Sequence, residues 1–188
     1  MKQLLPTALA ALLTLSMPEL GIAQRADDAY LKFDPIVEGE SRLALHVNEI
    51  ALEGFRSNLT RNIPPGVAVP GAKAQFAPLK VYKYIDKASV PLMVACALGT
   101  KYKSATLTVV RTRQNNAPYD AMKIVLTDVF VSGVDEGNEA TDGEGNLLEM
   151  VTLSYSKIEW TYIPLDNQGN PVLPGIKGGW DLVRGVRL

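Results

Sequence analysis

The sequence has little of what most catalytic and metal sites require. It contains one cysteine and one histidine among 188 residues, so an internal disulfide, a Cys/His zinc site and any site needing two histidines are excluded. Lysine and arginine number 19 against 20 aspartates and glutamates, and the net charge of −1 gives no general attraction to nucleic acid or to an anionic membrane. Binding, assembly or a carboxylate-based enzyme are the classes that remain.

Motifs for nucleophilic catalysis and phosphate binding are also missing. No GxSxG elbow, GxxxxGK[ST] loop or GxGxxG turn occurs in the sequence, and each of these would mark a particular chemistry. We interpret His46 as a strand side chain rather than a general base, and Cys96 as a small buried side chain rather than a nucleophile. The acidic, glycine-rich segment 133–146 lacks the regular spacing of a calcium loop and predicts a solvated hairpin loop. We therefore expect no catalytic residue, no metal site and no cofactor.

The first 23 residues differ in composition from the rest of the chain. Lys2 precedes an apolar run over 7–17, and Gly21 and Ala23 supply small residues ahead of Gln24. This layout is typical of a secretory signal peptide, and the run is too short to span a bilayer comfortably. An uncleaved apolar tail, or a true start at Met17, are the alternatives. We expect a leader over 1–23 and a single domain over 24–188.

Most of that domain shows apolar residues with a period of two, which predicts half-buried strands. The alternation is clear over 106–111 and 123–127. In the long run 150–163 the apolar side chains occupy odd positions up to Tyr155 and even positions from Ile158. Because side-chain direction alternates strictly along a strand, this switch predicts a β-bulge near Ser156 and Lys157.

Two segments depart from the strand pattern. Residues 89–98 begin with a serine, carry Pro91 in the first turn and are followed by Gly99, which predicts a short helix. Its expected buried face is Leu92, Val94, Ala95 and Leu98. Residues 62–71 contain three prolines and two glycines and predict an extended loop.

Four stretches resemble one protein family. They are YLKFDPIVEGES (30–41), the block from YIDKAS (84–89) through LMVAC (92–96) to Gly99, the strand IVLTDVFVS (124–132) and the closing Gly179-Trp180-Asp181. These stretches are similar to the haemolysin-coregulated proteins (Hcp), the inner-tube subunits of the bacterial type VI secretion system. The resemblance extends from about Ala26 to Leu188, and the YIDKAS to LMVAC block is its most specific part.

The resemblance implies a fold and a function. The fold is mainly β, with two sheets closing into a barrel, one short flanking α-helix and an extended loop. The function is that of a structural subunit, not an enzyme, whose hexameric rings stack into a tube and carry effectors in the lumen. The protein itself would be secreted through the type VI apparatus from the cytoplasm, whereas a cleaved signal peptide would direct it to the periplasm.

The resemblance also implies partners and site residues. The partners are other copies of the chain, the sheath, baseplate and spike proteins, and effector proteins; nucleic acid and membrane are not expected. Arg56 and Ser57 fall where the family has a lumen-facing residue and are the candidates for effector binding. The candidate ring-stacking loop is Asn62, Ile63, Pro64, Pro65, Gly66 and Val67. The alternative function is a monomeric periplasmic or secreted β-barrel that binds a ligand or acts as a carboxylate-based hydrolase.

Overall fold

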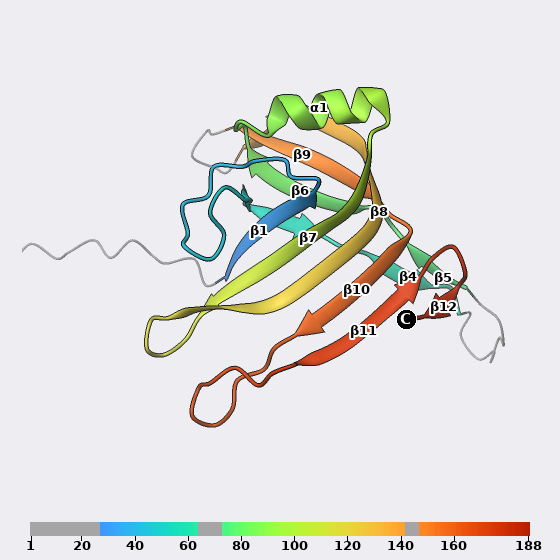
Figure 1. Ribbon diagram of the computed structural model, residues 1–188. Helices are drawn as coiled ribbons and strands as arrows, with labels where there is room; N and C mark the ends of the chain where they lie inside the picture. Colours follow the sequence, from blue (N-terminus) through green and yellow to red (C-terminus); the bar gives the residue numbers. More distant parts are fainter. Residues whose placement is uncertain (1–26, 64–72, 142–146) are drawn as a thin grey trace, which may run out of the picture.

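The computed structural model describes residues 27–63, 73–141 and 147–188 (Figure 1). Over these residues the chain is mainly β with one short helix. In chain order the elements are β1 (Asp27–Asp34), β2 (Ile50–Leu52), β3 (Gly54–Arg56), β4 (Leu59–Arg61), β5 (Ala74–Phe76), β6 (Leu79–Tyr84), α1 (Ser89–Leu98), β7 (Lys101–Thr112), β8 (Pro118–Thr141), β9 (Leu147–Ser154), β10 (Lys157–Tyr162), β11 (Ile176–Asp181) and β12 (Val186–Arg187).

The main sheet is organised around β8, which is 24 residues long. One path of antiparallel strands runs β12-β11-β10-β8-β7-β1-β2, and a second leaves β8 through β9 and β6 to β3. Strand β8 pairs with β10 over 122–127 and with β9 over 130–141, so the sheet divides along its length. Strands β4 and β5 form a separate two-stranded sheet.

The prediction of two sheets closing into a barrel is wrong. The described strands form one large open sheet and one small one, and closure would require an unbroken ladder of paired strands. Strands β2 and β3 are three residues each, and the chain bends between them at Glu53, so β2 pairs only with β1 and β3 only with β6. Segments this short, joined by a bend, give neither strand the length to pair with both neighbours.

The period-two prediction is confirmed by the core. Alternate side chains of β1, β6, β7, β8 and β9 point to one side and pack together, and each burial of a large apolar side chain contributes about 1.5–3 kcal/mol. The fully buried members include Phe33, Val81, Leu107, Leu126 and Leu153.

The helix prediction is confirmed, although its buried face is only half right. Helix α1 packs against β8 through Leu92 and Ala95, whereas Val94 and Leu98 are 50% and 76% exposed. It ends at Gly99, which takes the left-handed conformation (φ 64°) and donates its N–H to the Cys96 carbonyl. Only glycine adopts this conformation without steric cost.

The switch in side-chain direction between β9 and β10 is confirmed, but not by the predicted bulge. Phe130 pairs with Ser154 and Thr127 with Lys157, so no residue is inserted on either strand. The strand is interrupted at Tyr155 and Ser156 instead, opposite Asp128, whose φ of 55° is left-handed. The Ser156 hydroxyl donates to the Asp128 carboxylate (2.7 Å), which holds the interruption in place.

Candidate functional site: the outer face of β3 and the β4–β5 arm

The two predicted effector-binding residues lie at the end of β3. Arg56 is exposed and pairs with Lys80 of β6, and residues directly opposite in an antiparallel ladder share a face. Leu79 and Val81 point into the core, so Lys80 and Arg56 point away from it. Neither cation has a carboxylate partner among the described residues, and like charges directly opposite each other destabilise a sheet. An anionic group placed over them would remove this cost.

Sequence reasoning missed Lys80, although a signal was present. The alternation over 79–84 places Lys80 on the outer face of β6, but the pairing of β6 with β3 is a long-range contact that the pattern does not specify. Ser57 is exposed and lies in the short link between β3 and β4. The next residue, Asn58, accepts a backbone hydrogen bond from Ala77 (3.0 Å), so the link is held opposite the start of β6.

The strands on either side of the predicted extended loop, β4 and β5, form a two-stranded sheet, which we call the arm. Leu59 pairs with Phe76 and Arg61 with Ala74, and Asn62 and Ile63 follow β4 as exposed residues. The other candidate stacking residues, Pro64, Pro65, Gly66 and Val67, lie outside the described residues.

Aromatic contacts fix the base of the arm. Phe76 stacks against Trp160 of β10 and Trp180 of β11, with ring centroids 6.4 and 6.3 Å apart. The Tyr155 hydroxyl donates to the Ala77 carbonyl (3.2 Å). Aromatic pairs at these separations contribute roughly 0.5–1.5 kcal/mol beyond their buried area, so Trp180, in the closing Gly-Trp-Asp, helps to set the position of the arm.

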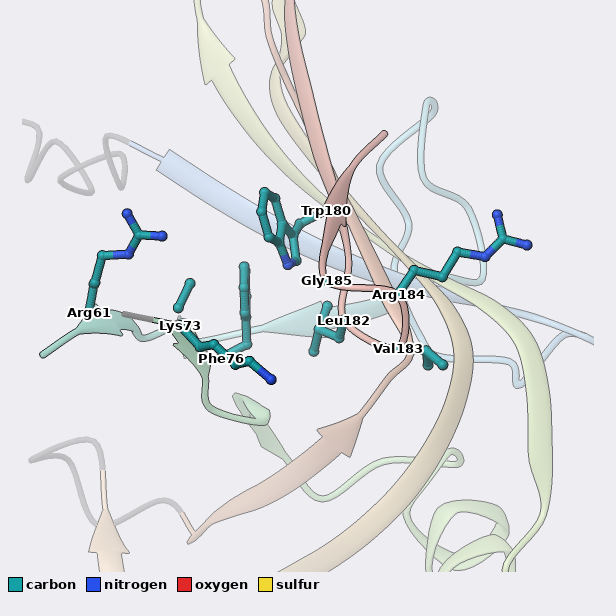
Figure 2. Close-up of a pocket in the computed structure, with 9 residues that line it drawn as sticks. Arg61, Lys73, Phe76, Trp180, Leu182, Val183, Arg184 and Gly185 are labelled. Carbon is teal, nitrogen blue, oxygen red and sulfur yellow. The ribbon is translucent and has the colours of Figure 1, made fainter. Parts of the chain in front are cut away.

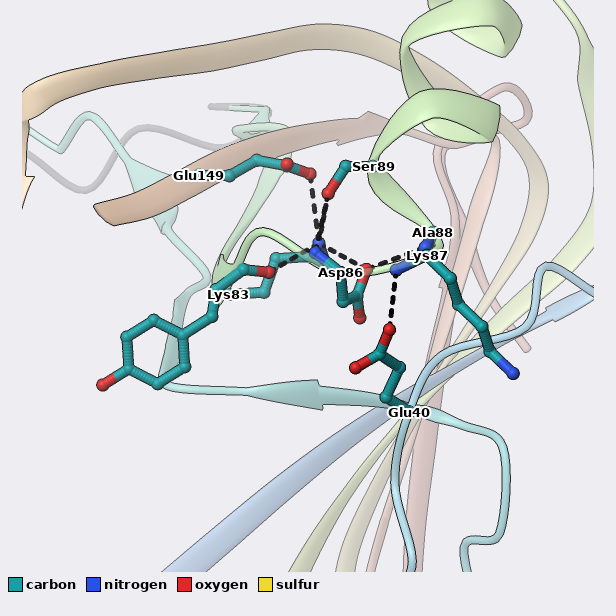
Figure 3. A network of polar contacts seen from close by, with 8 residues as sticks. Glu40, Lys83, Asp86, Lys87, Ala88, Ser89 and Glu149 are labelled. Atoms are coloured by element: carbon teal, nitrogen blue, oxygen red, sulfur yellow. Dashed lines mark hydrogen bonds and ion pairs between the residues drawn. The ribbon is translucent and has the colours of Figure 1, made fainter. Parts of the chain in front are cut away.

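The YIDKAS block forms a buried ionic network where α1 begins (Figure 3). Lys83 and Glu149 are both 0% exposed, and their Nζ and Oε1 atoms are 3.3 Å apart. Lys83 Nζ also lies 2.8 Å from Asp86 Oδ1 and donates to Ser89 Oγ (3.0 Å) and to the Tyr84 carbonyl (2.8 Å). A buried ammonium is tolerated only when it is paired in this way. The network ties β6, β9 and the start of α1 together.

His46 lies in a turn between β1 and β2, so its prediction as a strand side chain is wrong. It is buried, stacks on Tyr30 (4.7 Å), and places its ring nitrogens 2.8 Å from Glu49 Oε2 and 3.1 Å from Asp120 Oδ1. Burial would raise the pKa of Asp120, but hydrogen bonds from Lys123 and His46 outweigh burial and hold this pKa below its ordinary value. Both imidazole nitrogens are engaged, which leaves neither available as a general base.

Within residues 27–63, 73–141 and 147–188, no group of three or more His, Cys, Asp or Glu side chains could hold a metal ion. Over the same residues, no helix has the length and apolar character needed to cross a membrane. Cys96 is half-buried on α1.

Comparison with known proteins agrees with this arrangement. Residues 30–162 match the model of the family described as "Type VI secretion system effector, Hcp". Protein hcp1 of Pseudomonas aeruginosa is 30% identical over 164 residues, covering 86% of this chain and 99% of that protein.

Solved structures give the same result. The structure of a type six secretion system protein superposes with a TM-score of 0.76 at 26% identity, covering 87% of this chain and all of the other. Hcp1 from Salmonella typhimurium superposes with a TM-score of 0.67 at 31% identity, covering 87% and 99% of the two chains.

The family match over most of the chain, together with the relatives and solved structures above, defines a mainly β protein of type VI secretion. The chain belongs to the Hcp family. Members of this family are structural proteins rather than enzymes, as the sequence predicted.

Proposed function

We propose that this chain is a structural subunit of the type VI inner tube. It assembles into hexameric rings, the rings stack into a tube, and effector proteins travel in the lumen and are secreted together with the subunit. The sheath, baseplate and spike proteins are the other partners of the tube. Membership of the Hcp family is the starting point, and the proposal adds a specific assembly, the hexameric ring and the stacked tube.

The exposed apolar side of α1 is the observation that carries the proposal. Val90, Val94 and Leu98 lie four residues apart, so they form one stripe along the helix, and all three are exposed. None of the ten residues of α1 is charged. Continuous apolar surface of this kind marks a protein contact rather than a solvated face, and assembly of several copies gives it a place to be buried.

The outer face of β3 supplies the proposed effector contact. Arg56 and Ser57 line the lumen in this proposal, and Lys80 adds a second positive charge beside Arg56. A cationic wall favours effectors with acidic surfaces. The arm, with Asn62 and Ile63 at the end of β4, contributes to contacts between stacked rings, together with Pro64, Pro65, Gly66 and Val67.

Residues 1–23 form the proposed leader, and residues 24–188 the Hcp-like domain. Edman sequencing of the protein recovered from culture medium of the native host gives the first residue of the secreted form. A start at or near Gln24 supports removal of a leader, whereas a start at Met1 or Met17 contradicts removal.

The assembly is tested on the purified chain by light scattering coupled to gel filtration and by negative-stain microscopy. We expect a mass close to six protomers and ring-shaped particles. Val94→Asp and Leu98→Asp, introduced together, should shift the distribution towards monomer, because each charge would have to be desolvated at an apolar contact.

A matched control is Lys177→Gln with Arg42→Gln, which changes the net charge by the same −2 at two exposed positions outside α1. This variant should keep the wild-type mass. A wild-type chain that stays monomeric at high protein concentration would contradict the proposed assembly.

A further inference from the structure

A pocket lies where the arm meets the C-terminal strands (Figure 2). Its volume is about 480 Å³, and it is lined by Phe76 of the arm, Trp180 of β11 and the turn 182–185 between β11 and β12. Phe76 and Trp180 are only half-buried, so a flat apolar surface remains accessible at its centre. A concave apolar floor with a few charged groups around it is the usual form of a binding site.

The charged groups around this pocket are all positive. Arg61 is the last residue of β4, Lys73 directly precedes β5, and Arg184 stands on the opposite turn. Among the described lining residues there is no aspartate or glutamate, and none of the three cations is paired with a carboxylate of the described chain. The ligand that suits this pocket is therefore an acidic peptide segment.

The chain itself contains such a segment. The hairpin that joins β8 to β9, residues 133–146, carries five carboxylates and no lysine or arginine. Its described members Asp135 and Glu136 are exposed on β8. The last pair between β6 and β9 is Tyr84 with Leu148, so the hairpin extends past the neighbouring strand β6.

The pocket and the acidic hairpin cannot meet within one molecule. Figure 1 shows β4, β5 and β12 at the lower right of the molecule, and the ends of β8 and β9 that lead to the hairpin at the upper left. Complementary groups at opposite ends produce head-to-tail contacts between copies, which repeat in one direction.

We propose that the acidic hairpin of one copy binds in the cationic pocket of a second copy and so joins successive rings. The proposal rests on the ring assembly proposed above. A pocket of this size gives a small, charged contact, which is too little for the permanent interface within a ring. Between two rings the same contact forms six times together, and the equilibrium constants then multiply.

Charge reversal tests the contact in the full chain. Arg61→Glu with Lys73→Glu leaves the pocket with a net negative charge, and Asp135→Lys, Glu139→Lys and Asp142→Lys together leave the hairpin with a net positive charge. Each of these two variants should keep single rings and reduce the fraction of rings in stacks by roughly tenfold or more, measured by sedimentation velocity and negative-stain microscopy. Combining both sets of changes in one chain should restore stacking, because the charges are complementary again.

The control is Arg42→Glu with Lys177→Glu, which changes the net charge by the same −4 as the pocket variant but away from the pocket, and it should leave stacking unchanged. Loss of the rings themselves in either reversal variant would place the contact within the ring and overturn the proposal. Unchanged stacking in both reversal variants would also overturn it, and would leave the uncharged segment 64–72 as the alternative occupant of the pocket. Failure of the combined variant to recover stacking would also count against the contact.

A peptide measurement separates this proposal from the assembly itself. A synthetic peptide of residues 133–146 is titrated into the dispersed wild-type chain, and tryptophan fluorescence is recorded, since Phe76 contacts both tryptophans of the chain. We expect saturable binding that weakens roughly tenfold between 50 and 500 mM NaCl. The same peptide with Asn and Gln in place of its acidic residues should not bind. Binding to a chain that forms no rings would contradict the proposed function only, whereas no binding to a chain that forms rings would contradict this contact.

Discussion

Removing one member of the buried pair between Lys83 and Glu149 should destabilise the fold strongly, and to a different extent for each partner. Lys83→Met leaves Glu149, which is 0% exposed, and Asp86 without their cation. Loss of one partner of a buried ion pair costs about 3–5 kcal/mol, and we expect Lys83→Met at the upper end. Glu149→Leu should cost less, about 3 kcal/mol, because Lys83 keeps Asp86 at 2.8 Å.

The double variant Lys83→Met with Glu149→Leu is the decisive comparison. An apolar pair of similar volume avoids the desolvation of both charges, so this variant should be more stable than Lys83→Met alone by about 2 kcal/mol or more. Two singly destabilising changes that partly cancel give a coupling free energy, which the double-mutant cycle measures directly.

Urea unfolding followed by far-UV circular dichroism provides the free energies. With an m-value of about 2 kcal/mol/M, a loss of 3–5 kcal/mol lowers the midpoint by roughly 1.5–2.5 M. Lys103→Met, at a position 83% exposed, is the control and should shift the midpoint very little. Additive losses in the double variant would refute the coupling, and equal losses in the two single variants would refute the role given to Asp86.

Two further predictions concern the segment between β1 and β2 and its contacts. Because the pKa of Asp120 is lowered in the folded state, the carboxylate stabilises the fold above the ordinary pKa of 3.8, and this stability is lost as the pH falls through the lower folded value. Asp120→Asn should therefore cost about 1 kcal/mol at pH 7, after allowance for partial exposure, and much less at a pH below the lowered folded pKa of Asp120; urea titrations at pH 7 and at a series of acidic pH values measure this, and a cost independent of pH would contradict it. At Gly39 an added Cβ would overlap the Glu49 carbonyl and the Ile50 Cα, so Gly39→Ala should lose about 2–3 kcal/mol in the same assay, whereas Gly137→Ala, with open space around the Cβ position, should lose far less.

Local patterns in the sequence predicted the elements that local physics determines. The helix begins and ends where the serine, proline and glycine signals place it, at Ser89 and Leu98. The alternation in the first part of β8 identified Ile124 and Leu126 as buried correctly, whereas in β7 all four residues of 107–110 are buried. These features depend on residues close together in the chain.

Errors arose where the result depends on contacts between distant segments. The outward direction of Val94 and Leu98 is set by the angle at which α1 lies on β8, and the helix sequence, apolar on every side, does not define this angle. The sequence showed that apolar side chains switch from odd to even positions after Tyr155. The left-handed residue that accommodates the switch, Asp128, lies 28 residues away from Ser156 in the chain. Where the large sheet stays open likewise depends on which strands pair with β2 and β3.

The candidate site follows the same division. Arg56 and Ser57 were located through the resemblance, because no local pattern distinguishes them, whereas the prolines and glycines of 62–71 predicted the loop, and the resemblance supplied only its proposed role. Strand pairing places Lys80 beside Arg56, and packing places Trp180 against the arm. These neighbours come from distant parts of the chain, so the local sequence does not indicate them. The YIDKAS block was identified as specific from the sequence. Only the structure shows that Asp86 and Ser89 of this block contact Lys83, which is buried against Glu149.

The length of β8 has a mechanical consequence. Its 24 residues have a contour length of about 80 Å, the backbone turns at Asp128, and different parts of the strand pair with β7, β10 and β9. A force applied along β8 acts on many inter-strand hydrogen bonds in parallel and must slide them together, whereas a force across a sheet edge opens them one at a time. Because β7 and β10 pair with one part of β8 and β9 with another, the two halves of the large sheet share one backbone, and a displacement of either half is passed to the other through β8.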